Sequence, residues 1–282
     1  MGKLDGKVAV ITGGARGQGR SHAVTLAREG ADIVVCDIAA QIASVPFPMG
    51  TIEQLQETVQ LVEDLDRRCV AVEADVRDAA QVKAVVDRAL SEFGKVDILL
   101  ANAGIGSFSS VVDMTDEQWD DVINTNLKGV FNAMRAVLPH MIERRSGRIV
   151  ATSSMAGRVG MPNIAHYAAA KWGVIGLVKS VALEVAQYGI TVNAVCPTTV
   201  NTDMIHNEAT YKLFRPDLEN PTAEDALAAF SGLNVLPIPW VEAQDISNAI
   251  LFLVSDDARY ITGTAETRNR IAFEISCAST QG

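Results

Sequence analysis

Strand-sized apolar runs alternate with segments of helical periodicity along most of this chain. Strands are expected at residues 8–12, 32–36, 69–73, 96–101, 147–153 and 190–195. Such alternation predicts an α/β fold, in which a doubly wound parallel sheet carries helices on both faces. Ligands of such sheets bind beyond the carboxyl ends of the strands. Functional residues are therefore expected directly after individual strands.

The composition limits the classes of partner. Of the 282 residues, 48% are apolar, which is ample for the core of one large α/β domain. The formal net charge of −10 repels nucleic acid and anionic lipid. No apolar run approaches the roughly 18 residues that a membrane-spanning helix needs. We therefore expect neither a nucleic acid nor a membrane as partner.

The cysteines are scattered along the chain at positions 36, 69, 196 and 277, without a CxxC pair. This spacing favours free structural thiols in a reducing compartment, and it predicts no metal site. Lys7 already opens the first expected strand, so no signal peptide is expected. Together these features predict a cytoplasmic protein.

Two segments interrupt the alternation. The helix that should follow Asp37 is delayed by residues 38–50, which include two prolines. Residues 203–240 contain four prolines around one expected short helix, capped at Thr222. Connections of this length are usually functional, and residues 203–240 are expected to form a lid over a substrate.

A glycine-rich turn, TGGARGQG, follows the first strand at residues 12–19. Its glycines would let the backbone approach a pyrophosphate, which then lies at the N-terminus of the next helix. The turn is not a P-loop, because no Gly-Lys-Ser/Thr follows it. A plain glycine-rich turn is the alternative, which the strand before it and the helix after it disfavour.

Asp37 ends the second strand, 18 residues after Gly19. A carboxylate at this place can accept both adenosine ribose hydroxyls of NAD, whereas it repels the 2′-phosphate of NADP. Two unit charges about 4 Å apart at an effective dielectric constant near 20 interact by roughly 4 kcal/mol. Asp37 therefore favours NAD, although Arg16 could offset the repulsion and leaves NADP as the alternative.

Tyr167 and Lys171 stand four residues apart on an expected helix, residues 166–188, and so share one face of it. A neutral-pH base needs a tyrosine pKa about three units below its usual value near 10. A nearby ammonium and an oxidised nicotinamide could supply that shift between them. Ordinary helices also contain this spacing, so the other motifs decide its meaning.

Three further motifs lie at or near the carboxyl ends of the expected strands, where ligands of a parallel sheet bind. Thr152-Ser153-Ser154-Met-Ala-Gly157 closes the fifth strand, and Asn102-Ala-Gly104 follows the fourth. Asn126-Leu-Lys-Gly129 falls within a long helix expected at residues 116–143. With the turn and the Tyr–Lys pair, they resemble the short-chain dehydrogenase/reductase family in identity and order, over about residues 6–200.

The resemblance implies a single Rossmann domain over residues 1–282, with about seven strands in the order 3-2-1-4-5-6-7, assembled into a homotetramer. It implies a catalytic set of Asn126, Ser154, Tyr167 and Lys171. It implies NAD contacts from Gly13, Arg16, Gly17, Gln18, Gly19, Asp37, Asp75, Val76, Asn102, Ala103, Gly104, Tyr167, Lys171, Pro197, Val200 and Thr202.

The implied roles are chemically coherent. Tyr167 would exchange a proton with the substrate oxygen while hydride moves at carbon, and Ser154 would donate a hydrogen bond to that oxygen. Lys171 would lower the pKa of Tyr167 and hold the nicotinamide ribose. Asn126 would anchor a water that links Lys171 to solvent. The protein positions the reactants while the nicotinamide carries the hydride.

The chain departs from the family in two places. Thr198 stands where the family has a glycine after the sixth strand, while Val200 and Thr202 keep the positions that contact the carboxamide. Near the C-terminus, strand-like alternation occurs at residues 271–275, later than the family's last strand.

A narrower resemblance rests on the ARGQGR turn, the insertion at residues 38–50 and the FRPDLENPTAED segment. These are similar to carveol-dehydrogenase-like enzymes, also described as mycofactocin-coupled dehydrogenases. That resemblance implies NAD that is held tightly and recycled in place by an external redox carrier. Because residues 38–50 begin just past Asp37, we expect them to fold over the adenosine end of the cofactor and slow its exchange.

The sequence thus predicts an NAD-dependent alcohol dehydrogenase/reductase acting on CH–OH groups. Its substrate would be a hydrophobic secondary alcohol or ketone, carveol-like or otherwise cyclic. Apolar side chains of the lid would line the substrate pocket or pack within the lid: Phe214, Leu218, Phe230 and Trp240. An NADP-linked ketone reductase and an NAD-binding protein without turnover are the alternative functions.

Overall fold

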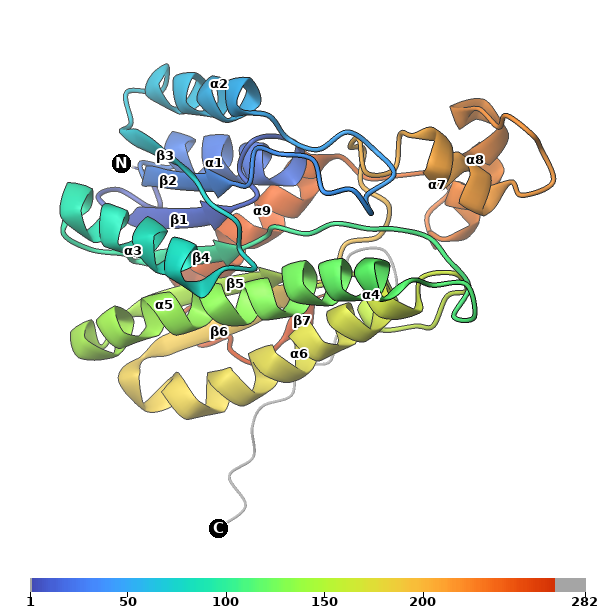
Figure 1. Cartoon of the computed structure of the whole chain (residues 1–282). Coiled ribbons are helices and arrows are strands. Elements are labelled where there is room, and N and C mark those ends of the chain that lie inside the picture. Colours follow the sequence, from blue (N-terminus) through green and yellow to red (C-terminus); the bar gives the residue numbers. More distant parts are fainter. Residues whose placement is uncertain (1, 267–282) are drawn as a thin grey trace, which may run out of the picture.

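The computed structural model describes residues 2–266 (Figure 1). Within this range it contains a seven-stranded, fully parallel sheet in the order β3-β2-β1-β4-β5-β6-β7. The strands are β1 (Val8–Thr12), β2 (Asp32–Asp37), β3 (Cys69–Glu73), β4 (Ile98–Ala101), β5 (Gly147–Thr152), β6 (Ile190–Val195) and β7 (Ala265–Glu266). The α/β class predicted from the sequence pattern and the strand order implied by the family resemblance are both confirmed.

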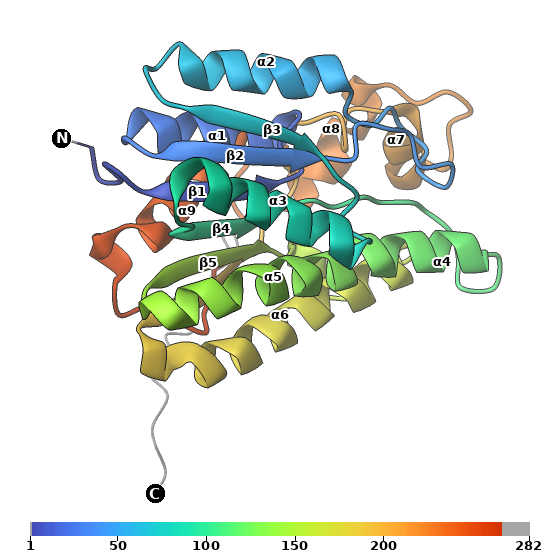
Figure 2. The ribbon, with the colours of Figure 1, turned by 60° about the vertical axis from the view of Figure 1, so that its left-hand side comes forward.

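Helices cover both faces of the sheet (Figures 1 and 2). They are α1 (Gly17–Arg28), α2 (Ile52–Glu63), α3 (Ala79–Phe93), α4 (Asp116–Ile123), α5 (Gly129–Arg144), α6 (Ala165–Val185), α7 (Glu208–Phe214), α8 (Ala223–Gly232) and α9 (Ala243–Val254). None of the helices in the described range is long and apolar enough to cross a membrane.

Successive residues of each strand enter different cores, because strand side chains alternate between the two faces. Val10 and Leu99 pack with the apolar residues of α3, α5 and α6. Their neighbours Ile11 and Leu100 pack with those of α1, α2 and α9. This burial on both faces explains why the strands read as continuous apolar runs.

The long helix expected over residues 116–143 is not uniform. It divides into α4 and α5, and residues Asn124–Lys128 between them form a π-helical turn. Such turns recur at functional sites. The π-helical turn could not be predicted from the sequence, since apolar spacing hardly differs between an α-helix and one wider turn.

The two interruptions lie at the carboxyl end of the sheet. Residues 38–50 form a loop before α2, whose N-terminus carries the capping box of Thr51 and Gln54. Residues 203–240 hold two helices rather than the one expected: Thr222 caps α8, and Asn207 caps the additional helix α7. In Figure 1, α7 and α8 lie on the side of the molecule to which the 38–50 loop extends.

The last described strand is short. β7 begins two residues after Gly263 and pairs with β6 through Ala194–Ala265 and Val195–Glu266. The alternating residues 271–275 and Cys277 lie outside the described residues. Cys36, Cys69 and Cys196 are buried and free, as the sequence indicated.

Candidate active site

The glycine-rich turn packs tightly against the loop after β4. Gly13 and Gly17 have φ angles of +70° and +54°, which disfavour any other residue. A Cβ on Gly19 would lie 1.9 Å from the Gly13 carbonyl oxygen. The Thr12 hydroxyl accepts the N–H groups of Asn102 and Ala103, both at 3.0 Å. The two loops therefore form one rigid floor at the carboxyl end of the sheet.

A cleft lies on this floor, with an empty volume of about 940 Å³ that includes open solvent. We call it the glycine-loop cleft. Twelve of the residues expected to contact a cofactor line it: Gly13, Arg16, Gly17, Gln18, Gly19, Asp37, Asp75, Val76, Asn102, Ala103, Gly104 and Thr202. The fold thus gathers residues from the ends of four strands and from the segment after β6.

Asp37 is fixed at one end of this cleft. Its carboxylate accepts the backbone N–H of Ala15 at 3.1 Å and that of Ala39 at 3.2 Å. Gly50 approaches from the other side, where an added Cβ would lie 3.3 Å from the Asp37 Oδ1 atom. An ionised carboxylate can accept more than two hydrogen bonds, so Asp37 retains free acceptor capacity toward the cleft.

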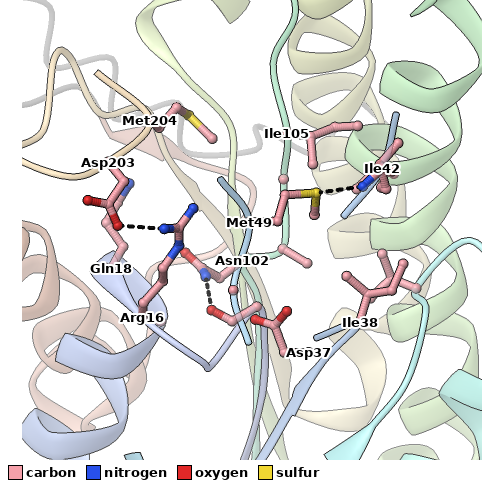
Figure 3. A pocket seen from close by; sticks show the side chains of 18 of the residues that line it. Arg16, Gln18, Asp37, Ile38, Ile42, Met49, Asn102, Ile105, Asp203 and Met204 are labelled. Atoms are coloured by element: carbon pink, nitrogen blue, oxygen red, sulfur yellow. Dashed lines mark hydrogen bonds and ion pairs between the residues drawn. The ribbon is translucent and has the colours of Figure 1, made fainter. Parts of the chain in front are cut away.

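Arg16 contacts both interrupting segments, and Figure 3 shows its pairing with Asp203. Its guanidinium pairs with Asp203 at 2.6 Å and donates to the carbonyl oxygen of Pro48. Asp203 opens the 203–240 segment, and Pro48 belongs to the 38–50 loop. Arg16 is therefore engaged by a carboxylate and a carbonyl.

The 38–50 loop is folded rather than loose. The Gln41 amide donates to the carbonyls of Ile42 and Val45, both at 3.0 Å, and accepts the N–H of Met49 at 3.1 Å. Ile42, Val45 and Phe47 are buried with Ile105 and Val122, and Tyr167 and Met204 pack against this cluster. The loop therefore reaches from the Asp37 end of the cleft to the neighbourhood of Tyr167, farther than the sequence suggested.

A second cavity, the apolar pocket, adjoins the cleft and has an empty volume of about 1050 Å³ that includes open solvent. Ser154, Tyr167 and Lys171 line it, as do Pro197 and Val200, which complete the expected cofactor contacts. Much of its wall is apolar: Phe108, Met155, Met161, Ile164, Met204, Ile205, Leu213, Phe214 and Leu233. The polar trio thus faces a cavity suited to a hydrophobic molecule.

Burial governs the charges of the Tyr–Lys pair. The Lys171 ammonium donates to the Thr152 carbonyl oxygen at 2.8 Å and lies 5.5 Å from the centre of the Tyr167 ring. Burial lowers the pKa of Lys171 to about 8. It also raises the pKa of Tyr167, which hydrogen bonding with Ser154 only partly opposes. These side chains alone therefore do not produce the lowered Tyr167 pKa expected from the sequence, because desolvation outweighs them.

Known proteins similar to this chain support the reading of the two cavities. The model of the short chain dehydrogenase family matches residues 7–212. A (−)-trans-carveol dehydrogenase of Rhodococcus erythropolis is 51% identical over 267 residues, covering 94% of this chain and 96% of that protein. This chain belongs to the short-chain dehydrogenase family.

Solved structures of family members resemble this dehydrogenase throughout. Carveol dehydrogenase from Mycobacterium avium, crystallised in complex with NAD, gives a TM-score of 0.93 at 49% identity, covering 95% of this chain and 97% of that one. A short chain dehydrogenase from Mycobacterium paratuberculosis bound to NAD gives 0.87 at 37% identity, with 95% and 98% covered. The family that the sequence motifs indicated and the enzyme class that they predicted, a short-chain alcohol dehydrogenase/reductase, are therefore confirmed.

Asn126 of the dehydrogenase lies near Lys171, since a Cβ added at Gly104 would be 3.3 Å from Asn126 Oδ1 and 3.5 Å from Lys171 Nζ. It is fully buried in the π-helical turn and borders neither cavity. Its amide accepts the N–H of Ile105 and donates to the Ile105 carbonyl oxygen, both at 2.8 Å. In this structure Asn126 therefore fixes the loop after β4, on which Gly104 and Ile105 border the cleft.

Several lining residues of the dehydrogenase escaped the sequence analysis. Ser107 borders the apolar pocket, and its hydroxyl pairs with the buried His166 Nε2 atom at 2.7 Å. Its place three residues after Gly104 was the available signal. Of the four apolar residues expected in a lid, Phe214 lines the pocket, whereas Leu218, Phe230 and Trp240 do not. Phe230 is buried behind Phe214, with ring centres 4.8 Å apart, and Trp240 packs on His206.

Proposed function

We propose that this enzyme transfers hydride between NAD and a hydrophobic secondary alcohol or ketone, carveol-like or otherwise cyclic. One observation carries the proposal: Ser154, Tyr167 and Lys171 line the apolar pocket, which shares five lining residues with the adjoining glycine-loop cleft. A dinucleotide in the cleft and an apolar alcohol in the pocket would then meet beside a proton donor. The relative named a carveol dehydrogenase supports a cyclic alcohol as substrate.

The cleft fits NAD. Within the described residues the N-cap position of α1, Arg16, has no side-chain capping hydrogen bond, so the first N–H groups of α1 are available to a pyrophosphate. Asp37 offers acceptors for ribose hydroxyls at the other end. The pairing of Arg16 with Asp203 leaves Arg16 a weak candidate to recruit a 2′-phosphate, which supports NAD over NADP. The two neighbours crystallised with NAD support the same choice.

In the proposed mechanism, bound NAD supplies the hydride acceptor or donor. Tyr167 exchanges a proton with the substrate oxygen, and Ser154 donates a hydrogen bond that stabilises developing negative charge there. The positive charge of an oxidised nicotinamide is required to lower the Tyr167 pKa, since burial raises it. Lys171 adds a positive charge below a pH of about 8. Asn126 positions the loop after β4.

The test is turnover of a panel of cyclic secondary alcohols with NAD and, separately, with an artificial electron acceptor. Tyr167→Phe should lower kcat by about 10²–10⁴, the usual contribution of a general acid or base. Full turnover in Tyr167→Phe would contradict the mechanism. Absence of turnover by the wild-type protein with both acceptors would favour the NAD-binding protein without activity.

We propose that the 38–50 loop is an insertion that closes over the adenosine end of NAD, and that residues 203–240 form a lid over the substrate. Arg16 connects them, and the buried cluster of Ile42, Val45 and Phe47 anchors the insertion. Slow release of NAD would then require recycling in place by an external redox carrier. Activity with only the artificial acceptor would support this.

A homo-oligomer, a tetramer by family resemblance, is proposed for the assembly. Large apolar side chains are exposed on α5 and α6, including Phe131, Trp172 and Leu183. Exposed apolar groups that gather on adjoining elements are typical of subunit contacts. Sedimentation of the purified protein tests this directly.

A further inference from the structure

Gln18 has a buried oxygen without a partner. It lies between Gly17 and Gly19 in the first turn of α1 and lines both the glycine-loop cleft and the apolar pocket. Its Oε1 atom is buried and accepts no hydrogen bond from any residue in the described range. Native proteins pair nearly all buried polar atoms, because an unpaired one is costly. An unpaired acceptor on a cleft wall indicates that the ligand supplies the donor.

The place of Gln18 shows which part of the ligand lies beside it. Five residues border both cavities: Gln18, Asn102, Gly104, Thr202 and Met204. Hydride passes only between carbons in contact, so an alcohol beside Tyr167 and Ser154 requires the nicotinamide ring at this junction. This step rests on the proposed function.

The nicotinamide end carries an amide with two N–H donors. Thr202 offers one acceptor, because its hydroxyl donates to the Val200 carbonyl at 3.2 Å and keeps its lone pairs. The glycine loop lies against the same residue, since a Cβ on Gly17 would be 3.3 Å from Thr202 Cγ2. Gln18 directly follows Gly17, and Gln18 and Thr202 both line the cleft and the apolar pocket.

We propose that the Gln18 Oε1 atom accepts one N–H of the nicotinamide carboxamide, leaving the other to Thr202 Oγ1, whose position the family resemblance already assigns to that group. The carboxamide is attached to one side of the ring, so holding both N–H groups fixes which ring face meets the substrate. Gln18 is thus a recognition residue for the nicotinamide end, and a methionine or leucine of similar size could fill its space without that function.

The experiment compares the binding of three probes to dinucleotide-free protein by calorimetry. NAD has the complete carboxamide, acetylpyridine adenine dinucleotide has a methyl group in place of the amide nitrogen, and ADP-ribose lacks the ring. The wild type should bind NAD about tenfold more tightly than the acetyl analogue. In Gln18→Met this preference should fall about fivefold, the effect of one neutral hydrogen bond. ADP-ribose affinity should be unchanged.

Three results separate this inference from the proposed function. An unchanged NAD preference in Gln18→Met, with ADP-ribose binding intact, would overturn the inference alone. Equal wild-type affinity for NAD and the acetyl analogue would also overturn it, even if Gln18→Met and Gln18→Leu fail to fold. Absence of NAD binding by the wild type would contradict the proposed function itself.

Discussion

Lys171 shows how one residue can lower stability at a functional site. Its side chain is 3% exposed, and burial lowers its pKa from 10.5 to about 8. A change of this size corresponds to about 3 kcal/mol at neutral pH, as an upper bound. The buried ammonium is therefore retained against a free-energy cost, as is common for groups that take part in chemistry.

Lys171→Met should stabilise the dinucleotide-free protein by about 1–2 kcal/mol at pH 7, because the loss of a donor to the Thr152 carbonyl offsets part of the gain. Between pH 8 and 10.5 the folded protein binds fewer protons at this site than the unfolded chain. The cost is thus complete below pH 8 and declines above it, so the gain should shrink as pH rises. Urea unfolding at several pH values measures this.

The control is Lys179→Met, an exposed position of the same helix, which should change stability by less than about 0.5 kcal/mol. Lower stability of Lys171→Met than of wild type at pH 7 would contradict the argument.

Asp37 is expected to decide cofactor choice by charge. Asp37→Asn keeps the size of the side chain and an acceptor for Ala15 or Ala39, but removes the charge that repels a 2′-phosphate. An interaction of roughly 4 kcal/mol corresponds to about two to three powers of ten in selectivity. The ratio of kcat/KM for NADP to that for NAD should rise accordingly. An unchanged ratio would refute the role given to Asp37.

At the scale of elements, a buried polar pair joins α1 to α9. His22 and Ser247 are both fully buried, and Ser247 Oγ lies 2.7 Å from His22 Nδ1. Burial lowers the pKa of His22 to about 3, so the ring is neutral at physiological pH. α1 carries the glycine-rich turn at its N-terminus, so this pair also supports the floor of the cleft.

Ser247→Ala should lower the free energy of unfolding by about 1–3 kcal/mol, since it leaves a buried histidine nitrogen without its partner. Chemical denaturation at pH 7 provides the measurement. Asn248→Ala, at an exposed position of α9, serves as the matched control and should have an effect below about 0.5 kcal/mol. Equal effects of the two changes would show that the pair contributes nothing.

At the scale of the whole molecule, segments far apart in sequence meet around one cavity system. Gln41 organises the 38–50 loop, Arg16 connects that loop to Asp203, and Ser44 donates to Asp121 of α4 at 2.7 Å. Deleting the loop would also expose the buried cluster next to Tyr167. A point change is therefore the sharper test of whether the loop slows NAD exchange.

Gln41→Ala should speed NAD release about tenfold while leaving the chemical step with a saturating alcohol unchanged. The reason is that the loop loses the side chain that holds the carbonyls of Ile42 and Val45 and the N–H of Met49. This rate is measured by adding excess ADP-ribose to protein with bound NAD. The NAD released over time is then quantified by mass spectrometry. Gln60→Ala, exposed on α2, is the control. Equal release from both variants would reduce residues 38–50 to an ordinary loop.

Local sequence determined much of this protein. Apolar runs such as residues 8–12 specified buried strands, and side-chain caps such as Thr51 and Thr222 specified helix starts, because these effects act within a few residues. The motifs placed Ser154, Tyr167 and Lys171 near strand and helix ends, where ligands of a parallel sheet bind, whereas the strand order came only from the family resemblance.

Only the tertiary structure decided the rest. The π-helical turn at Asn126, the Arg16–Asp203 pair, the reach of the 38–50 loop toward Tyr167 and the pocket wall of α7 all depend on partners distant in sequence. Desolvation likewise has no local signature, so the raised pKa of Tyr167 and the lowered pKa of Lys171 appear only once the chain has buried them. Contacts that form within a helical turn can be inferred from sequence, whereas burial and long-range pairing are properties of the assembled fold.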